Sequence, residues 1–274
     1  MSRNNQVTNL STHRWEPWTG CSKISKGCEN CWAHYSLKVM KKKYPFNEMA
    51  DPFNFRVHED QLDINNPLFL SDDLNIPKRI WVTDRSDSFF DQKIDDKFLL
   101  SNDLIFQTFE IMGHIPTHRF ILCTKRSKRL ADLGPQLPWK PCIWSGVTIE
   151  SSNYMERLDA LKTCGALNKF IIFEPLLEKI PEFDPKGIDL IVVGGEAGPA
   201  ARPMEAEWVR HLRDITKKAG ISFLFKHWSS FGTKGGVGGN KENVIDGRRW
   251  EEYPDSMLTN KDYIELWKKQ GYIK

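Results

Sequence analysis

The chain has 274 residues, of which 40% are hydrophobic, and this is enough to build a sizeable core in one large domain. Its 39 basic and 36 acidic residues give a net charge of +3, which excludes a polycationic coat protein for nucleic acid. No apolar run approaches the ~20 residues that span a bilayer, and the N-terminus lacks the apolar stretch of a signal peptide. We therefore expect a cytoplasmic protein without membrane contact, in which the six cysteines stay thiols unless they bind a metal.

The positive charge is concentrated at the start of the chain. Residues 1–50 hold eight Lys or Arg and three Glu, which gives this segment a net charge of +5 and leaves −2 for the rest. Aromatic side chains are interleaved with these basic residues at Trp15, Trp18, Trp32 and Tyr35. Such rings can stack nucleobases beside phosphate-binding cations, or they can pack around a buried group and shield it from water. Both interpretations stay open from the residues alone.

Three cysteines lie within eleven residues, at Cys21, Cys28 and Cys31, with the spacing C-x6-C-x2-C. A glycine precedes each of the first two, which lets the backbone wrap closely around a ligand, and residues 31–43 have a helical pattern. A structural zinc ion needs four ligands, and His34 is the nearest candidate for the fourth. An iron–sulfur cluster can be held by three cysteines, with one iron left for a small molecule. Three free thiols in a tight loop are the remaining alternative. The other three cysteines are expected to be small buried hydrophobic residues.

Between residues 79 and 230, short apolar runs alternate with segments of helical periodicity. Strands are expected at 79–83, 120–123, 143–147, 170–173, 190–193 and 222–225. Helices are expected at 98–112, at 125–133, after a cap at Ser151 or Ser152, and at 205–219. This alternation predicts a parallel sheet. We expect an α/β fold of the (β/α) TIM-like barrel type, complete or partial, rather than a doubly wound sheet.

Polar residues follow nearly every expected strand, and in barrels this carboxyl end is where ligands bind. Glu174, Lys226 and His227 are the candidate catalytic residues from these clusters. A buried Glu is rare unless it is paired, and His227 could donate a proton. The alternatives are a structural ion pair for Glu174 and a packed ring for His227.

A second polar cluster, Gly194-Gly195-Glu196, follows the expected strand at 190–193, and Arg202 lies shortly after it. A carboxylate surrounded by backbone amides and carbonyls suits an ammonium group. We therefore assign Gly194, Gly195, Glu196 and Arg202 as candidate cofactor-binding residues. A purely structural turn is the alternative.

From residue 231 onward the alternating pattern weakens. The expected elements here are a glycine-rich loop at 232–239, a hairpin around Asp246-Gly247 and a closing helix at 259–270. We assign residues 1–230 to the barrel, with the cysteine loop at 19–35, and residues 231–274 to a closing extension of the same domain.

Eight different short motifs are distributed along almost the whole chain. In order they are Trp15-Glu-Pro-Trp-Thr-Gly-Cys21, Gly27-Cys28-Glu-Asn-Cys31, Ser86-Asp-Ser-Phe-Phe90, Leu122-Cys-Thr-Lys-Arg126, Trp144-Ser-Gly-Val-Thr-Ile-Glu150, Phe173-Glu-Pro-Leu-Leu177, Val193-Gly-Gly-Glu196 and Phe225-Lys-His-Trp228. Together they resemble the phage-type three-cysteine-motif proteins, which are similar to radical S-adenosylmethionine enzymes. The resemblance implies a radical-SAM-like barrel and a 4Fe-4S cluster on Cys21, Cys28 and Cys31. The first gap of six residues departs from the usual C-x3-C-x2-C spacing, which weakens the inference to S-adenosylmethionine more than the inference to a cluster.

The leading functional hypothesis is a radical S-adenosylmethionine-type enzyme with a 4Fe-4S cluster. It would cleave S-adenosylmethionine to start radical chemistry on a nucleotide or nucleic acid, with electrons from a reductant protein. The alternative is a metal- or cluster-stabilised nucleic-acid-binding protein without radical chemistry. A third possibility is a barrel hydrolase in which the cluster is only structural.

Overall fold

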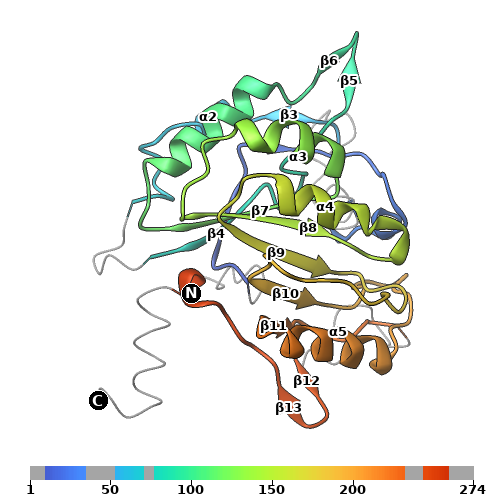
Figure 1. Cartoon of the computed structure of the whole chain (residues 1–274). Coiled ribbons are helices and arrows are strands. Elements are labelled where there is room, and N and C mark those ends of the chain that lie inside the picture. The colour runs from blue at the N-terminus through green and yellow to red at the C-terminus, as the bar shows by residue number, and fades with distance from the viewer. Residues whose placement is uncertain (1–9, 35–52, 71–76, 232–242, 259–274) are drawn as a thin grey trace, which may run out of the picture.

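The computed structural model describes residues 10–34, 53–70, 77–231 and 243–258, and its main element is a seven-stranded parallel sheet (Figure 1). In spatial order the strands are β1 (His13–Trp15), β4 (Arg79–Val82), β7 (Arg119–Thr124), β8 (Ile143–Thr148), β9 (Asn168–Phe173), β10 (Leu190–Val193) and β11 (Ser222–Phe225). Spatial order therefore follows chain order without a reversal, whereas a doubly wound sheet has a point where the order reverses. This order is compatible with the expected barrel, and hydrogen bonds join the seven strands from β1 to β11 among the described residues.

Helices connect the strands and lie along the outer side of the curved sheet (Figure 1). They are α2 (Asn102–Gly113), α3 (Ser127–Leu133), α4 (Glu156–Thr163) and α5 (Ala206–Lys218). Short 3-10 turns are found at η1 (Lys26–Cys28), η2 (Glu59–Gln61), η3 (Gly134–Gln136), η4 (Ser152–Tyr154) and η5 (Asp255–Met257). None of the helices in the described ranges has the length and apolar character that a membrane crossing requires.

Two expected helix starts are wrong. Residues 97 and 98 belong to the strand β6 (Lys97–Phe98), which pairs with β5 (Lys93–Ile94), so α2 begins only after its cap at Ser101. The Ser101 side chain accepts a hydrogen bond from the Leu104 amide at 3.1 Å. Neither Ser151 nor Ser152 caps α4, because a 3-10 turn at Ser152–Tyr154 intervenes and the helix begins after Met155.

The smaller sheets include one that the sequence predicted. The hairpin of β12 (Val244–Ile245) and β13 (Arg248–Arg249) is present, and its two turn residues, Asp246 and Gly247, both have positive φ, as a type I′ turn requires. The strands β2 (Trp18–Thr19) and β3 (Arg56–Val57) form a second antiparallel pair. Residues 32–34 are helical, and the remainder of the helix expected at 31–43 lies outside the described residues, as do the glycine-rich loop and the closing helix.

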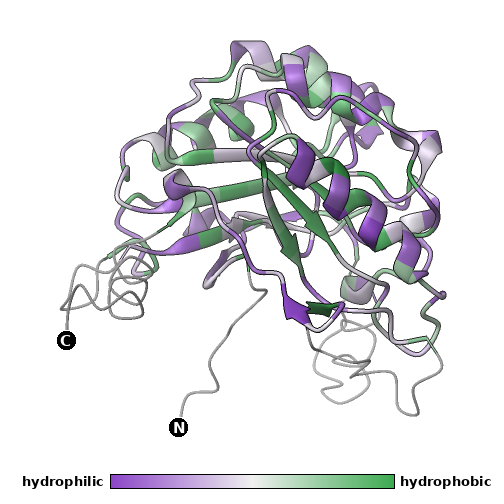
Figure 2. Cartoon of the chain, turned by 60° about the horizontal axis from the view of Figure 1, so that its bottom comes forward, coloured by the Kyte–Doolittle hydropathy of each residue, from purple (hydrophilic) through white to green (hydrophobic). Residues whose placement is uncertain are grey.

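The strands bury both faces, and Figure 2 shows them as an apolar centre beneath helices with polar outer sides. One face packs against the helices: Phe120, Ile143, Ile171, Ile191 and Phe223 lie in one cluster with the apolar residues of α2 to α5. The other face forms a second cluster of inward-pointing side chains, which are Leu10, Ile121, Trp144, Phe170, Ile172, Leu190, Val192, Leu224 and Met257. Side chains alternate between faces along a strand, so every second residue belongs to this inner face.

One glycine shows how tightly the inner face is filled. A methyl group on Gly146 would lie 2.3 Å from the ring of Phe170 on the neighbouring strand. The ring occupies the space over the glycine, because the two residues are register partners in β8 and β9. The interior of the sheet is therefore packed with side chains at this level.

Candidate functional site

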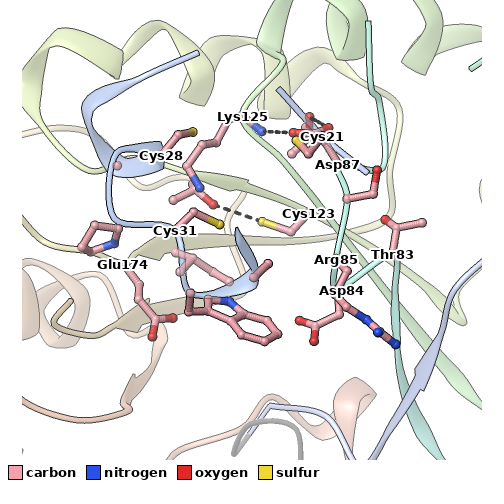
Figure 3. Close-up of a pocket in the computed structure, with 18 of the residues that line it drawn as sticks. Cys21, Cys28, Cys31, Thr83, Asp84, Arg85, Asp87, Cys123, Lys125 and Glu174 are labelled. Carbon is pink, nitrogen blue, oxygen red and sulfur yellow. Dashed lines mark hydrogen bonds between the residues drawn. The ribbon is translucent and has the colours of Figure 1, made fainter. Parts of the chain in front are cut away.

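A cavity of about 360 Å³ opens at the carboxyl ends of the parallel strands (Figure 3). The two-residue alternation explains its wall, because the inner positions continue past the apolar layer into polar residues. Inner positions at the strand ends include Thr83, Cys123, Lys125, Thr148, Glu174 and Lys226, and all of them line the cavity. The expected ligand-binding end of the fold is therefore also where the structure has its cavity.

The three cysteines of the N-terminal loop all line this cavity (Figure 3). The amide of Cys21 bonds to the carbonyl of Phe53 at 3.1 Å, and Cys28 ends the turn η1. Gly20, before the first cysteine, has φ +92°, and a methyl group there would lie 2.3 Å from a backbone oxygen. Only glycine allows this close backbone approach, which turns the loop into the cavity.

A fourth cysteine also faces the cavity. Cys123 at the end of β7 is half-buried and lies 3.4 Å from the hydroxyl of Thr148. The expectation that Cys123 is only a small buried residue is therefore incomplete, because it overlooked the inner-face position. Cys142 and Cys164 are buried in the core, as expected.

Two consecutive cations follow β7 and bring positive charge to the cysteines. Arg126, almost fully buried, has Nη2 3.8 Å from the Cys21 sulfur, and Lys125 lines the cavity wall. Burial alone would lower the pKa of Lys125, but negative charge at Cys28 and Glu150 outweighs burial and raises it.

The same cations act on the thiols. Burial raises the pKa of Cys21 to about 12, with Arg126 opposing this shift only in part. Burial alone would also raise the pKa of Cys28, but the Lys125 ammonium and hydrogen bonds to the sulfur outweigh it and lower that pKa. Metal binding requires deprotonated thiols, and Cys28 is held in the environment that favours this.

Three thiols at one cavity form a donor set that a 4Fe-4S cluster can use, with one iron left free of cysteine. Ligands of one zinc ion converge to within ~2.3 Å of the metal. In the part of the chain that the structure describes, no group of three Cys, His, Asp or Glu converges in this way, and the His34 ring instead packs edge-on against Phe53. Thiolates of a cluster each bind a different iron, so three thiols that line one cavity beside cations suit it.

The three candidate catalytic residues are brought together at one cavity wall. Glu174 contacts the Lys226 ammonium through one carboxylate oxygen, and its other oxygen lies 3.0 Å from His227 Nε2. Burial alone would raise the pKa of Glu174, but Lys226 and His227 outweigh burial and lower it to about 2. The carboxylate is therefore ionised at neutral pH and orients both neighbours.

The candidate cofactor-binding residues also meet, but largely with one another. The carboxylate of Glu196 is buried and accepts hydrogen bonds from Arg202 Nε at 2.9 Å and from Asn30 Nδ2 at 3.2 Å. A methyl group on Gly195 would lie 2.2 Å from the Ser229 amide, so two backbone segments touch there. Gly195 and Glu196 line the cavity, while Arg202 ties Glu196 to the cysteine loop.

The N-terminal aromatic residues separate into two classes. Trp15 and Trp18 are buried core residues whose ring N–H groups donate to backbone carbonyls. Trp32 is 43% exposed at the cavity wall, and the Arg14 guanidinium lies 5.4 Å from its ring centre. Tyr35 lies outside the described residues.

Sequence reasoning missed two carboxylates of the site. Asp84 lines the cavity and pairs with Arg14 at 2.6 Å, and burial raises the pKa of Asp84. Glu150 is completely buried behind the cysteine loop. Both residues belong to the polar clusters after strands, but sequence alone did not indicate which members of these clusters face inward.

The chain belongs to the family described as "Protein of unknown function (DUF5131)", whose model matches residues 6–254. The match covers the cysteine loop and every described cavity residue. It does not confirm the phage-type assignment that the motifs suggested. No curated protein matches the chain.

One solved structure is similar over much of the chain, a mutant of spore photoproduct lyase with dinucleoside spore photoproduct. The two share 13% sequence identity with a TM-score of 0.40, over 80% of this chain and 64% of that one. This chain thus spans less than two thirds of the length of that protein. A likeness of this extent says nothing about the reaction of this chain.

Proposed function

We propose that this member of the DUF5131 family is an iron–sulfur enzyme of the radical S-adenosylmethionine type. Cys21, Cys28 and Cys31 hold a 4Fe-4S cluster in this proposal. The observation that carries it is the placement of all three at one cavity, beside the cations after β7. A bound cluster with one iron free of cysteine supplies an electron and a coordination position for S-adenosylmethionine.

The segment after β10 is the proposed contact for S-adenosylmethionine. Gly195 brings backbone close to the cavity without a side chain, and Glu196 adds a carboxylate. Burial alone would raise the pKa of Glu196, but hydrogen bonds from Arg202 and Asn30 outweigh burial and lower it. An ionised carboxylate between backbone groups suits the ammonium end of such a ligand, with Arg202 holding Glu196 in place.

Glu174, Lys226 and His227 are the proposed proton-handling group. The ionised carboxylate holds the ammonium of Lys226 and the ring of His227 at the cavity wall, within reach of a bound molecule. Charged donors that are fixed in a partly dry cavity stabilise charge that develops on a substrate. Lys226 and His227 thus bind and orient the substrate and exchange protons with it.

The proposed substrate is a nucleotide or a nucleic acid. Trp32 offers a partly exposed aromatic face at the cavity wall, and Arg14 is the cation beside it. Stacking on an aromatic side chain contributes ~1–3 kcal/mol per base, and a neighbouring cation can meet a phosphate. A reductant protein supplies the electrons.

Anaerobic purification followed by iron, sulfide and zinc analysis tests the proposal. We expect iron and sulfide in the proportion of one 4Fe-4S cluster per chain, and 5′-deoxyadenosine from S-adenosylmethionine under reducing conditions. Zinc without iron would overturn the cluster. Iron without 5′-deoxyadenosine would favour a cluster-stabilised nucleic-acid-binding protein.

Two cysteine variants make the test specific. Cys28→Ala removes a cavity thiol and is expected to abolish iron binding, because two cysteines cannot hold the cluster. Cys142→Ala removes a thiol buried in the core and is expected to keep it. Stoichiometric iron in Cys28→Ala refutes the ligand assignment.

A further inference from the structure

The turn that carries Cys28 rests directly on a buried carboxylate. The amide of Gly27 donates to Glu150 Oε1 at 3.3 Å, and the amide of Lys26 donates to the Tyr154 hydroxyl at 3.3 Å. Glu150 follows β8, so this end of the sheet holds the turn through two consecutive backbone amides. Neither contact involves a side chain of the cysteine loop, so the contacts fix the path of its backbone.

The carboxylate of Glu150 is paired with an arginine of α4. Arg157 Nη1 of α4 lies 2.8 Å from Glu150 Oε2 and 2.6 Å from the carbonyl of Thr148, and both charged side chains are almost fully buried. A buried ion pair gains little stability over apolar residues of similar size, because both charges lose their hydration. The pair is therefore weak evidence for a role in stability alone.

Steric contact fixes the same turn. A methyl group on Gly27 would lie 3.0 Å from the carboxylate of Glu150, which is closer than ordinary contact. The turn therefore packs against the carboxylate so closely that a methyl group would require a shift of a few tenths of an ångström. Glu150 therefore contacts the turn in two ways, through the hydrogen bond to the Gly27 amide and through close packing against the Gly27 backbone.

The other side of the loop has its own anchor. Arg202 Nη2 donates to the carbonyl of Lys26 at 2.9 Å, and Asn30 Nδ2 donates to the carbonyl of Ala200 at 2.8 Å. This anchor follows β10 and is more open to solvent, since Arg202 is 28% exposed at its side chain. The loop between Lys26 and Asn30 is thus held from two strand ends, and only the Glu150 anchor is completely buried.

We infer that Glu150 is a positioning residue, which fixes the turn so that the Cys28 sulfur points into the cavity in a geometry ready for the cluster. This inference rests on the proposed function for the identity of the bound group. Glu150 is not among the residues that line the cavity, so it acts through the Gly27 amide and the Arg157 pair. Partners that orient a ligand residue in this way are commonly worth ~10- to 100-fold in metal affinity.

The test uses Glu150→Gln, which keeps the shape and the acceptor oxygen but removes the charge. The matched control is Glu156→Gln, which changes an exposed Glu on α4. After anaerobic reconstitution, Glu150→Gln is expected to lose iron to a chelator ~10- to 100-fold faster than the wild type, with an altered electron paramagnetic resonance spectrum. The control is expected to match the wild type, and wild-type behaviour of Glu150→Gln overturns the inference.

A second pair of variants covers the case in which Glu150→Gln does not fold. Gly27→Ala pushes the turn away from the carboxylate and is expected to speed iron loss to the same extent. Gly27→Ala combined with Glu150→Asp leaves room for the methyl group and is expected to recover at least part of the loss. Equal iron loss in the single and double variants would show that Glu150 and Gly27 do not act through contact, which overturns the inference.

A thiol measurement separates this inference from the proposed function. In iron-free protein, the alkylation rate of Cys28 by iodoacetamide, measured by mass spectrometry, reports the position of the turn without any cluster. Glu150→Gln or Gly27→Ala is expected to change this rate several-fold, while the rate at Cys142 stays constant. Wild-type protein that binds no iron overturns the proposed cluster alone, whereas an unchanged rate at Cys28 overturns the positioning role alone.

Discussion

The two ends of the inner face of the sheet have opposite chemistry. At the base, the inner positions are large and apolar, and Trp144, Phe170 and Leu190 are fully buried there. At the carboxyl end, the inner positions become polar, and Lys125 after β7 and Glu174 after β9 face a cavity. The alternation of side chains along the strands thus produces two different ends. One is the second apolar cluster, around Trp144 and Phe170, which we call the plug, and the other is the charged cavity. We expect substitutions at the base to change stability, and those at the cavity to change chemistry.

The largest effect on stability is expected at the base. Phe170→Ala removes a fully buried ring from the plug, and we expect a loss of about 3–5 kcal/mol in the free energy of unfolding, because a cavity remains. Urea unfolding measures this loss, with the 60% exposed Phe231→Ala as the matched control. Iron per folded chain is expected to stay at the wild-type value. Loss of iron in folded Phe170→Ala would show that the two ends are not separate.

A smaller loss is expected for Gly146→Ala, because the added methyl group overlaps the ring of Phe170. Overpacking of this kind costs about 1–3 kcal/mol. Gly113→Ala is the control, since its methyl group would find only ordinary contacts at 3.6 Å. In the Phe170→Ala background the added methyl group has room, so we expect most of the cost to disappear. Additive losses in the double variant would contradict the packed plug.

The smallest effect is expected at the cavity, and it depends on pH. The pKa of Glu174 is lowered from 4.5 to about 2, so its ionised form stabilises the fold above pH 4.5, and this stabilisation is lost as the pH falls towards 2. Lys226→Met removes the main charge partner, and we expect it to lower the free energy of unfolding by about 1–2 kcal/mol at neutral pH.

Urea unfolding between pH 2 and pH 7 checks the effect of Lys226→Met. The difference from the wild type is expected to shrink through the window from pH 4.5 to pH 2, because the carboxylate becomes protonated in both proteins. Lys217→Met, which breaks the exposed pair with Glu252, is the control and is expected to change little at any pH. A difference for Lys226→Met that does not vary with pH would contradict the assigned pairing.

The strands that are buried on both faces could be predicted from the sequence, because short continuous apolar runs such as Phe170–Phe173 and Leu190–Val193 are typical of such strands. Their parallel arrangement followed from the alternation with helices. The edge strand β1 (His13–Trp15) was missed, because it is three residues long and carries a His and an Arg. Its pairing with β4 is decided by contacts distant in sequence, which local pattern does not contain.

The site was predictable where spacing carries information and not where packing does. The spacing of Cys21, Cys28 and Cys31 identified the loop, and Glu174 was expected to be paired. Glu150 could not be singled out, since its burial depends on the turn at Gly27, far away in the sequence. Whether a polar residue after a strand faces the cavity depends on its register, and a shift of one residue reverses this.

The base of the inner face has a consequence for synthesis on the ribosome. Leu10 and Met257 both lie in the apolar plug, and Arg119 of β7 donates to the carbonyl of Ser256 at 2.7 Å. All seven strands of the sheet leave the ribosome before Met257 does. The nascent chain therefore carries its cysteines and its charged cavity wall while the plug is still incomplete. The apolar surface that Met257 covers stays uncovered until residues 255–257 emerge.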